Sequence, residues 1–248
     1  MMLRSFRMDL HIHTCLSPCG MPENVPSRII EKAVERGLHA IGICDHNASE
    51  NVAAVRSAAE DGSVHVLGGI EVTTKEEIHI LALFDKQEDL QLMQDVVYEN
   101  LSGKNDPDAF GQQYIVDNED YVTGFNEKLL MGATSLNLNE VIDAVHTYHG
   151  LAIASHIDRD AFSILSQLGI IPENLALDAV ELSRHHKESR FKLDLSSIGF
   201  PFVTFSDAHQ LDEIGSIFTS FTMKNPCIPE MQKALQGLEG RGVHPALS

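Results

Sequence analysis

The sequence predicts an α/β fold that closes, or nearly closes, into a barrel. Short apolar runs rich in β-branched residues alternate with segments of helical period, which is the pattern of a parallel sheet buried on both faces. About seven such units fit into the chain, and a series of that size is typical of a barrel. An open, doubly wound sheet is the alternative.

The first part of the chain supplies strands and helices in alternation. Strands are predicted over residues 7–14, 39–46, 64–74 and 77–84. Helices are predicted over about 27–36, closed by Gly37, over 49–62 with Ser49 as N-cap, and over about 88–101. Residues 102–134 then break the pattern, because they are polar, Gly-punctuated and weakly periodic. They predict a loop with a short helix or hairpin, which could form a lid.

The second part returns to the alternation. Helices are predicted over about 139–149, 159–168 and 228–238, and strands over 151–156, 178–183, 200–209 and 215–223. No internal repeat or long linker interrupts the chain, so a single domain over residues 1–248 is expected.

Composition narrows the class of protein. The chain has 248 residues, 43% of them hydrophobic, and lacks both a long apolar run and the pattern of a signal peptide. A cytoplasmic protein with reduced cysteines and no membrane partner is expected. The net charge of -18 argues against a groove for long nucleic acid, because such grooves use Lys and Arg. A small anionic substrate is compatible with it, since bound metal ions can reverse the local field.

Asp9-Leu10-His11-Ile12-His13 is the strongest local signal. Residues two apart on a strand share a face, so His11 and His13 can bind one metal while Leu10 and Ile12 pack behind them. Other apolar strands also end in, or carry, ionisable residues. These are Asp45, His46, Glu71, His79, His156, Asp207 and His209. Such groups are costly to bury unless paired, and we expect them to converge at one mouth of the barrel.

The order of these motifs resembles the polymerase and histidinol phosphatase (PHP) family of phosphoesterases. The matching pieces are DLHIHT, CDH, GIEVTT with EIHIL, ASH and SDAH, between Asp9 and about His209. The resemblance implies a distorted barrel of about seven βα units. It also implies hydrolysis of phosphate esters at two or three zinc, manganese or iron ions by a metal-activated hydroxide.

The ligands that this resemblance implies fall into three groups. His11, His13, Glu71 and Asp207 would hold one metal, Glu71 would bridge to a second with His79 and His156, and His46 with His209 would hold a third. Asp45 would orient its neighbour. The segment CLSPCG departs from the family pattern and places Cys19 eight residues after His11. Cys19 is either a thiolate ligand to the third metal or a plain loop thiol.

Phosphate also needs hydrogen-bond donors. Arg159, Arg184 and His186 follow predicted strands and are candidates to bind it. The alternative for the arginines is surface pairing with Asp158, Asp160 or Glu188. The predicted substrate is a small phosphomonoester of the nucleotide, sugar phosphate or histidinol phosphate type. A metal-dependent aminohydrolase is the nearest enzymatic rival, and a non-catalytic metal- or nucleotide-binding module is the other alternative.

Overall fold

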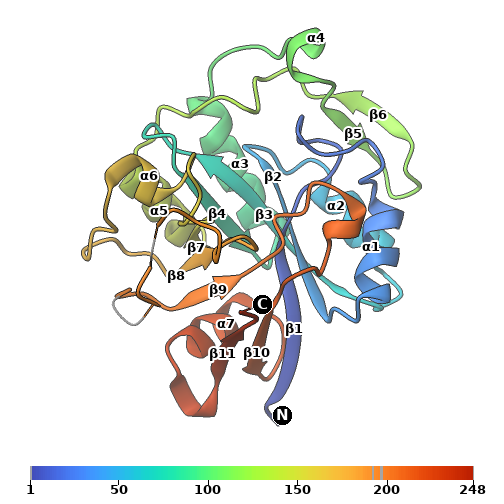
Figure 1. Ribbon diagram of the computed structural model, residues 1–248. Helices are drawn as coiled ribbons and strands as arrows, with labels where there is room; N and C mark the ends of the chain where they lie inside the picture. The colour runs from blue at the N-terminus through green and yellow to red at the C-terminus, as the bar shows by residue number, and fades with distance from the viewer. Residues whose placement is uncertain (1, 192, 196–197, 248) are drawn as a thin grey trace.

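The computed structural model describes residues 2–191, 193–195 and 198–247. Within them, a sheet of nine strands has the order β11-β10-β1-β2-β3-β4-β7-β8-β9 (Figure 1). Its strands are β1 Arg4–Ile12, β2 Ala40–His46, β3 His65–Thr73, β4 His79–Phe84, β7 Leu151–Ala154, β8 Ala179–Leu182, β9 Phe202–Thr204, β10 Thr219–Met223 and β11 Gly242–Pro245. The segment after β9 then pairs with β1 in parallel, Ile12 to Ala208. The sheet therefore nearly closes on itself, which confirms the predicted distorted barrel.

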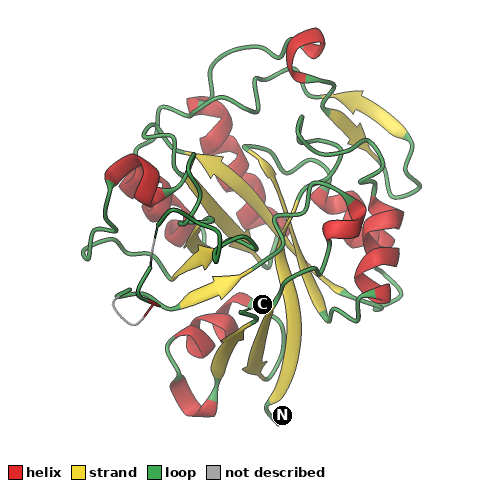
Figure 2. Ribbon diagram, in the orientation of Figure 1, coloured by secondary structure: helices red, strands yellow, loops and turns green. Residues whose placement is uncertain are grey.

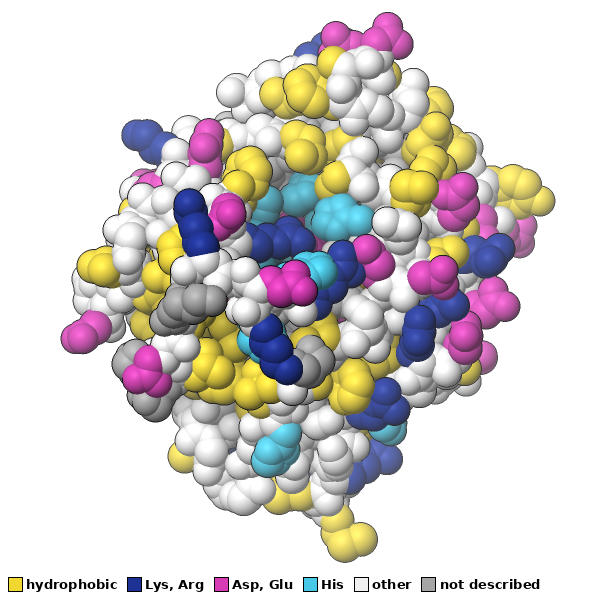
Figure 3. All heavy atoms as spheres, viewed as in Figure 1, with side chains coloured by type: hydrophobic (Ala, Val, Ile, Leu, Met, Phe, Trp, Pro, Cys, Tyr) yellow, Lys and Arg dark blue, Asp and Glu magenta, His cyan; other side chains and the backbone are white. Residues whose placement is uncertain are grey.

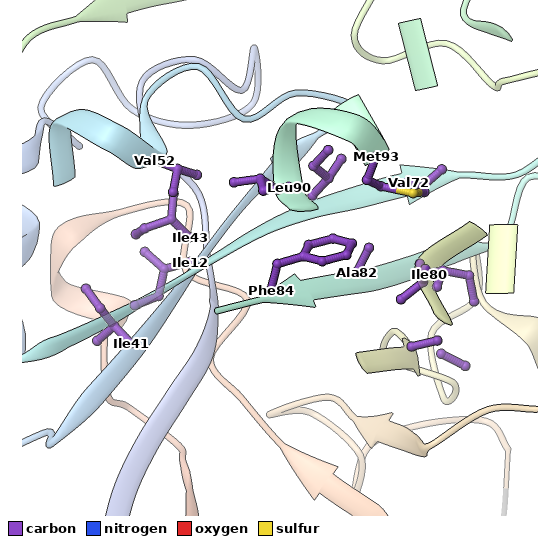
Figure 4. Close-up of a cluster of buried hydrophobic side chains, with 14 of the residues drawn as sticks. Ile12, Ile41, Ile43, Val52, Val72, Ile80, Ala82, Phe84, Leu90 and Met93 are labelled. Carbon is purple, nitrogen blue, oxygen red and sulfur yellow. The ribbon is translucent and has the colours of Figure 1, made fainter. Parts of the chain in front are cut away.

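Two hydrophobic clusters separate the faces of the sheet. Side chains such as Ile41, Ile70 and Ile80 pack under the outer helices α1 Pro26–Glu35, α2 Val52–Ala58, α3 Gln87–Asn100, α5 Leu138–Thr147 and α6 Ile164–Leu168. Figure 4 shows part of this cluster, and Figure 2 shows helices around the sheet. Side chains on the opposite face of the strands, such as Leu67 and Leu81, pack in the second cluster with α7 Ile228–Leu235. The period of two thus assigns alternate residues to the barrel interior.

The strand β4 runs opposite to β3 and β7. The expectation of an all-parallel sheet is therefore wrong at β4, and it is also wrong at β10, which runs antiparallel to β1 and β11. A tight turn joins β3 to β4, with Thr74 N–H donating to the Ile78 carbonyl (2.9 Å), and so short a connection permits only antiparallel pairing. His79 consequently begins its strand, yet it lies at the same edge of the sheet as the residues that end β2 and β3.

The excursion over residues 102–134 contains both a short helix and a hairpin. They are α4 Pro107–Phe110, β5 Tyr114–Val116 and β6 Val122–Phe125. Side-chain amides anchor this segment: Asn47 Nδ2 donates to the Leu130 carbonyl (2.9 Å) and Asn51 Nδ2 to the Tyr114 carbonyl (3.0 Å). Because Asn47 follows β2 directly, the excursion is fixed over the end of the barrel where the predicted ligands lie (Figure 1).

Several predicted boundaries move. The helix expected over 159–168 shortens to α6, because His156 and Phe162 adopt positive φ and the chain between them forms turns. The helix expected from Ser49 begins at Val52, and β11 was not predicted. Across the ranges that the structure describes, no helix combines the length and apolar character needed to cross a membrane.

A His–Asp pair between α5 and the residue before β8 predicts an effect of pH on the stability of the fold. His146 Nε2 lies 2.9 Å from Asp178 Oδ2, and the hydrogen bond to Asp178 raises the pKa of His146 above its usual value of 6.5. Because the pKa of His146 is higher in the folded than in the unfolded protein, its protonation fully stabilises the fold below about pH 6.5. That stabilisation is lost as the pH rises through the pKa of the folded state. In urea titrations, His146→Gln should therefore cost up to about 1 kcal/mol more at pH 6 than at pH 8.5. The exposed His244→Gln is the control, and an equal cost at both pH values would contradict the prediction.

Candidate metal centre

A register shift in β1 turns its two histidines toward the barrel interior. The pairing of β1 with β2 slips between Asp9 and Ile12, as at a β-bulge. Leu10 consequently packs inside the barrel, whereas Ile12 packs under the helices. The prediction that Leu10 and Ile12 pack on one face is thus wrong, because the extra residue inverts the alternation. The inversion brings His11 and His13 to the face that carries Glu71.

Glu71 lies at the middle of the cluster and is buried. Its two oxygens lie 3.0–3.5 Å from ring nitrogens of five histidines: His11, His13, His46, His79 and His156. Burial alone would raise the pKa of Glu71, but the surrounding imidazoles of His79, His11 and His46 hold it well below its usual range. A carboxylate surrounded by imidazoles is a ligand set for zinc, manganese or ferrous iron.

Asp207 completes this set from the segment that follows β9. Its Oδ1 lies 3.1 Å from His13 Nε2 and 3.3 Å from His11 Nε2. Its Oδ2 lies 2.6 Å from Arg159 Nη2. The backbone at Asp207 has φ 49°, a sparsely populated conformation for a non-glycine residue. The turn therefore points both oxygens of Asp207 at groups of the centre.

The ligand atoms fall into three overlapping groups that could each hold a cation. These are His13 with His46 and His209, His11 with His13 and Asp207, and His46 with Glu71 and His79. Burial lowers the pKa of His79 to about 4, so this imidazole is neutral and has a free lone pair at neutral pH. Within the described residues, the buried His11 Nε2 and Glu71 Oε2 make no hydrogen bond. Such buried atoms fit the presence of metal ions.

A cavity of about 150 Å³ opens onto these groups. Its lining comprises Cys19, His46, Glu71, Thr73, His79, Met131, His156, Arg159, Phe162, Asp207 and His209. Figure 3 shows a hollow in the surface with histidine and basic side chains in it and hydrophobic side chains around its rim. The structure therefore brings the predicted metal ligands together at one mouth. Their role as ligands stays a prediction.

Glu181 is a member of the site that the sequence reasoning missed. It lies on β8, is buried, and its oxygens lie 3.1 and 3.2 Å from His11 Nδ1. It also accepts a hydrogen bond from His156 N–H (3.1 Å). A carboxylate on the second nitrogen fixes the tautomer and orientation of a ligating histidine. The sequence signal for this role is the single acidic residue in the apolar strand DAVELS, because Glu181 points to the barrel interior on the same face as Ala179.

Asp45 hydrogen-bonds to Ser17 and Thr14, and in the part of the chain that the structure describes it makes no hydrogen bond to a predicted metal ligand. It accepts hydrogen bonds from the Thr14 N–H and hydroxyl (2.8 Å each) and from the Ser17 hydroxyl (2.6 Å). Ser17 Oγ in turn lies 3.0 Å from His13 Nδ1 and accepts from His46 N–H (3.2 Å). Asp45 is therefore linked through Ser17 to the ring of His13 and to the backbone of His46, and its role in orienting a ligand stays a prediction.

Cys19 is exposed at the edge of the cavity, near His46 and His209. Burial of its sulfur would raise the pKa of this thiol, but the charge of His46 and hydrogen bonds to His209 and His46 lower it to about 6. The position suits a thiolate ligand beside those two histidines. Ligation by Cys19 stays a prediction.

Two of the predicted phosphate-binding residues lie elsewhere. Arg184 Nη2 pairs with Glu213 Oε1 (2.7 Å), and Glu213 Oε2 accepts from His209 N–H (2.9 Å). His186 Nδ1 lies 3.0 Å from the Ser183 carbonyl, and its side chain lines a different cavity. Arg159 is the predicted phosphate-binding residue that lines the cavity of the metal centre. Arg184 instead supports the backbone that carries His209.

Fold and site together define a barrel protein with a metal centre of histidines and carboxylates at its mouth. The family model described as the PHP domain matches residues 9–191. The chain therefore belongs to the PHP domain family, which confirms the resemblance seen in its motifs.

Two curated relatives match short segments of the chain. A 5'-3' exoribonuclease of Haemophilus influenzae is 29% identical over 84 residues, 32% of this chain and 30% of that protein. A phosphoribosyl 1,2-cyclic phosphate 1,2-diphosphodiesterase of Eggerthella lenta is 30% identical over 80 residues, 30% of this chain and 29% of that protein. The matched segments thus span less than a third of these relatives.

Solved structures match over almost the whole chain. The lesion-specific endonuclease PfuEndoQ from Pyrococcus furiosus has a TM-score of 0.74 and 18% identity, covering 97% of this chain and 58% of that one. Endonuclease Q in complex with a 27-mer duplex substrate has a TM-score of 0.66 and 17% identity, covering 96% of this chain and 58% of that one. At 17–18% sequence identity, this likeness is evidence for a shared fold alone.

These structures correct one prediction. The exclusion of long nucleic acid as a partner is wrong, because a protein of the same fold is solved on a duplex with an abasic lesion at its active site. The net charge of -18 sums over the whole surface. It does not determine the field at one mouth, where bound metal ions would be the largest local charges and Arg159 lies beside them.

Glu181 gives a direct test of how the centre is built. Glu181→Gln keeps the size of the side chain but removes the charge beside His11 Nδ1, so metal affinity should fall by about 10- to 100-fold. Competition with a chromophoric chelator measures that affinity without turnover. The matched control is Glu188→Gln, which is exposed. Unchanged metal affinity in Glu181→Gln would show that this carboxylate does not orient His11 for metal binding.

Proposed function

We propose that the chain is a metal-dependent phosphoesterase that uses two or three divalent ions of zinc, manganese or iron. The observation that carries the proposal is the buried Glu71 carboxylate among five imidazoles, beside a cavity that Asp207 and Arg159 also line. When bound, such ions lower the pKa of a water molecule and neutralise phosphate oxygens.

The protein's own groups would position both the ions and the substrate. Glu71 would bridge two ions, and Asp207 would ligate the ion that His11 and His13 bind. Arg159 is paired with Asp207 in the structure. Asp207 would ligate the cation through Oδ1, and Arg159 Nη2 can stay paired with Oδ2 while its remaining N–H groups donate to a phosphate in the cavity. His79 accepts no proton at neutral pH, because burial lowers its pKa to about 4.

The proposed substrate is a small phosphomonoester such as a nucleotide, a sugar phosphate or histidinol phosphate. A cavity of about 150 Å³ beside the ligands accommodates a phosphate group. A phosphodiester within a nucleic acid is the second candidate. Its support is the fold shared with endonuclease Q over 97% of this chain and the segment shared with a 5'-3' exoribonuclease.

The test is hydrolysis by chelator-treated protein after addition of Mn²⁺, Zn²⁺ or Fe²⁺. We expect metal-dependent release of phosphate from p-nitrophenyl phosphate or from a panel of phosphomonoesters. A labelled single strand and a duplex with an abasic site test the second candidate. His11→Ala should lose activity, while the exposed His244→Ala should retain it. Metal-loaded protein without turnover on any phosphoester would favour a binding module, and deamination or amide hydrolysis would favour an aminohydrolase.

A further inference from the structure

Phe162 adopts a backbone conformation that a bulky aromatic residue rarely takes. Its φ is 57°, in the left-handed region, and it lies in the turns between β7 and α6. A hydrogen bond from His79 N–H to the Phe162 carbonyl (3.0 Å) holds the residue in place. Strained residues of this kind persist where the surroundings determine their conformation, and they cluster at active sites and ligand clamps.

The ring of Phe162 lies against a predicted metal ligand that lines the same cavity, His79. It stacks on His79 with ring centroids 4.7 Å apart and planes inclined by 17°. The residue is nevertheless 36% exposed, and it lines the cavity. An aromatic surface is thus available to a ligand whose phosphate is at the metal centre.

Two neighbours define what such a ligand would meet. Arg159 lies three residues before Phe162 on the same connection and lines the same cavity. Met131 reaches the cavity from the excursion over residues 102–134 and is 39% exposed. The cavity therefore combines the Arg159 guanidinium, the proposed phosphate-binding group, with two apolar side chains. A sugar phosphate has no flat apolar part to match Phe162 and Met131, whereas a nucleotide carries a base close to its phosphate.

We propose that Phe162 is a specificity-determining residue that stacks on the base of a nucleotide while Arg159 binds its phosphate. This inference rests on the proposed phosphoesterase function and narrows its substrate class. Stacking of bases on aromatic side chains is favourable for every base, so the preference is for nucleotides as a class. Met131 provides a polarizable apolar contact at the same cavity.

The first experiment compares kcat/KM for adenosine 5'-monophosphate and ribose 5-phosphate. The wild-type protein should prefer the nucleotide by about tenfold or more, and Phe162→Gly should reduce that ratio by about tenfold. Glycine relieves the positive φ, so loss of the ratio in this variant is not a consequence of backbone strain. Phe162→Tyr keeps the ring and should keep the ratio. His149→Gly relieves a similar φ of 61° at the end of α5 and should leave the ratio unchanged.

The second experiment measures binding without turnover. A hydrolysis-resistant phosphonate analogue of ethenoadenosine monophosphate should lose fluorescence on binding to the metal-loaded wild-type protein, because its base stacks. The quenching should disappear in Phe162→Gly and persist in Phe162→Tyr. A metal assay on each variant checks that His79 has not lost its metal.

The two proposals fail in different ways. If the protein hydrolyses both esters equally well, or if Phe162→Gly keeps the wild-type ratio, the role of Phe162 is overturned and the phosphoesterase function stands. If no phosphoester is hydrolysed, the proposed function is overturned. The fluorescence titration then decides the role of Phe162 as a base-binding residue.

Discussion

Glu71→Gln is expected to lower kcat/KM for any phosphoester substrate by about 10³-fold or more. Glu71 contacts five histidines of the centre, and its amide counterpart would neither bridge two cations nor supply the negative charge that holds them. Metal ions contribute several kcal/mol of transition-state stabilisation, and each 1.36 kcal/mol corresponds to about tenfold in rate. The measurement is steady-state kinetics alongside elemental analysis of the purified variant.

The control for this prediction is Glu173→Gln, at an exposed glutamate outside the cavity. The folded state of Glu71→Gln should be checked by circular dichroism, because Glu71 is buried. A folded Glu71→Gln protein that binds metal and turns over normally would refute the assignment of Glu71 as the bridging ligand.

Gly42→Ala is expected to destabilise the barrel and to displace a predicted ligand. A Cβ on Gly42 would lie 2.6 Å from the Leu10 carbonyl oxygen and 2.8 Å from Leu10 Cα. Both atoms belong to the backbone of β1, so the strand itself must move. Overpacking of this kind costs about 1–3 kcal/mol. Because Leu10 precedes His11, the same displacement should weaken metal binding.

Thermal or urea unfolding of metal-free Gly42→Ala measures the first effect, and chelator competition measures the second. Gly199→Ala is the matched control, because a Cβ there would meet no atom of the described residues within 4 Å and φ is not positive. Wild-type stability and metal affinity in Gly42→Ala would show that β1 has room to shift at this point.

The period of two explains why so much of the centre was predictable. Val203 and Phe205 face the interior of the barrel, so Asp207, two residues further on, faces the same side near the mouth. Leu67 and Gly69 likewise precede Glu71 on the interior face of β3. The alternation does not continue along β1, where a register shift between Asp9 and Ile12 changes the face to which His11 points. A bulge arises from pairing between strands, which the local sequence of β1 does not encode.

Other features depended on contacts between distant segments. Arg184 follows an apolar strand as Arg159 follows another, yet Arg184 pairs with Glu213 and Arg159 with Asp207. Their different positions relative to the cavity come from residues distant in sequence. Glu181 was not among the predicted site residues, although it lies within the apolar strand predicted over residues 178–183. A buried carboxylate on the inward face is itself a signal, since it requires partners such as His11.

The tight turn between β3 and β4 has a consequence for how the chain folds. Glu71 and His79 are eight residues apart and belong to one hairpin, and hairpins form within about 1–10 μs. His13 and Asp207 are 194 residues apart, and they meet only when the two ends of the sheet come together. Glu71 and His79 can therefore come together early, within one hairpin, whereas His13 and Asp207 come together only when the barrel closes. A cation that needs both parts would bind preferentially to the closed barrel and shift the folding equilibrium toward it.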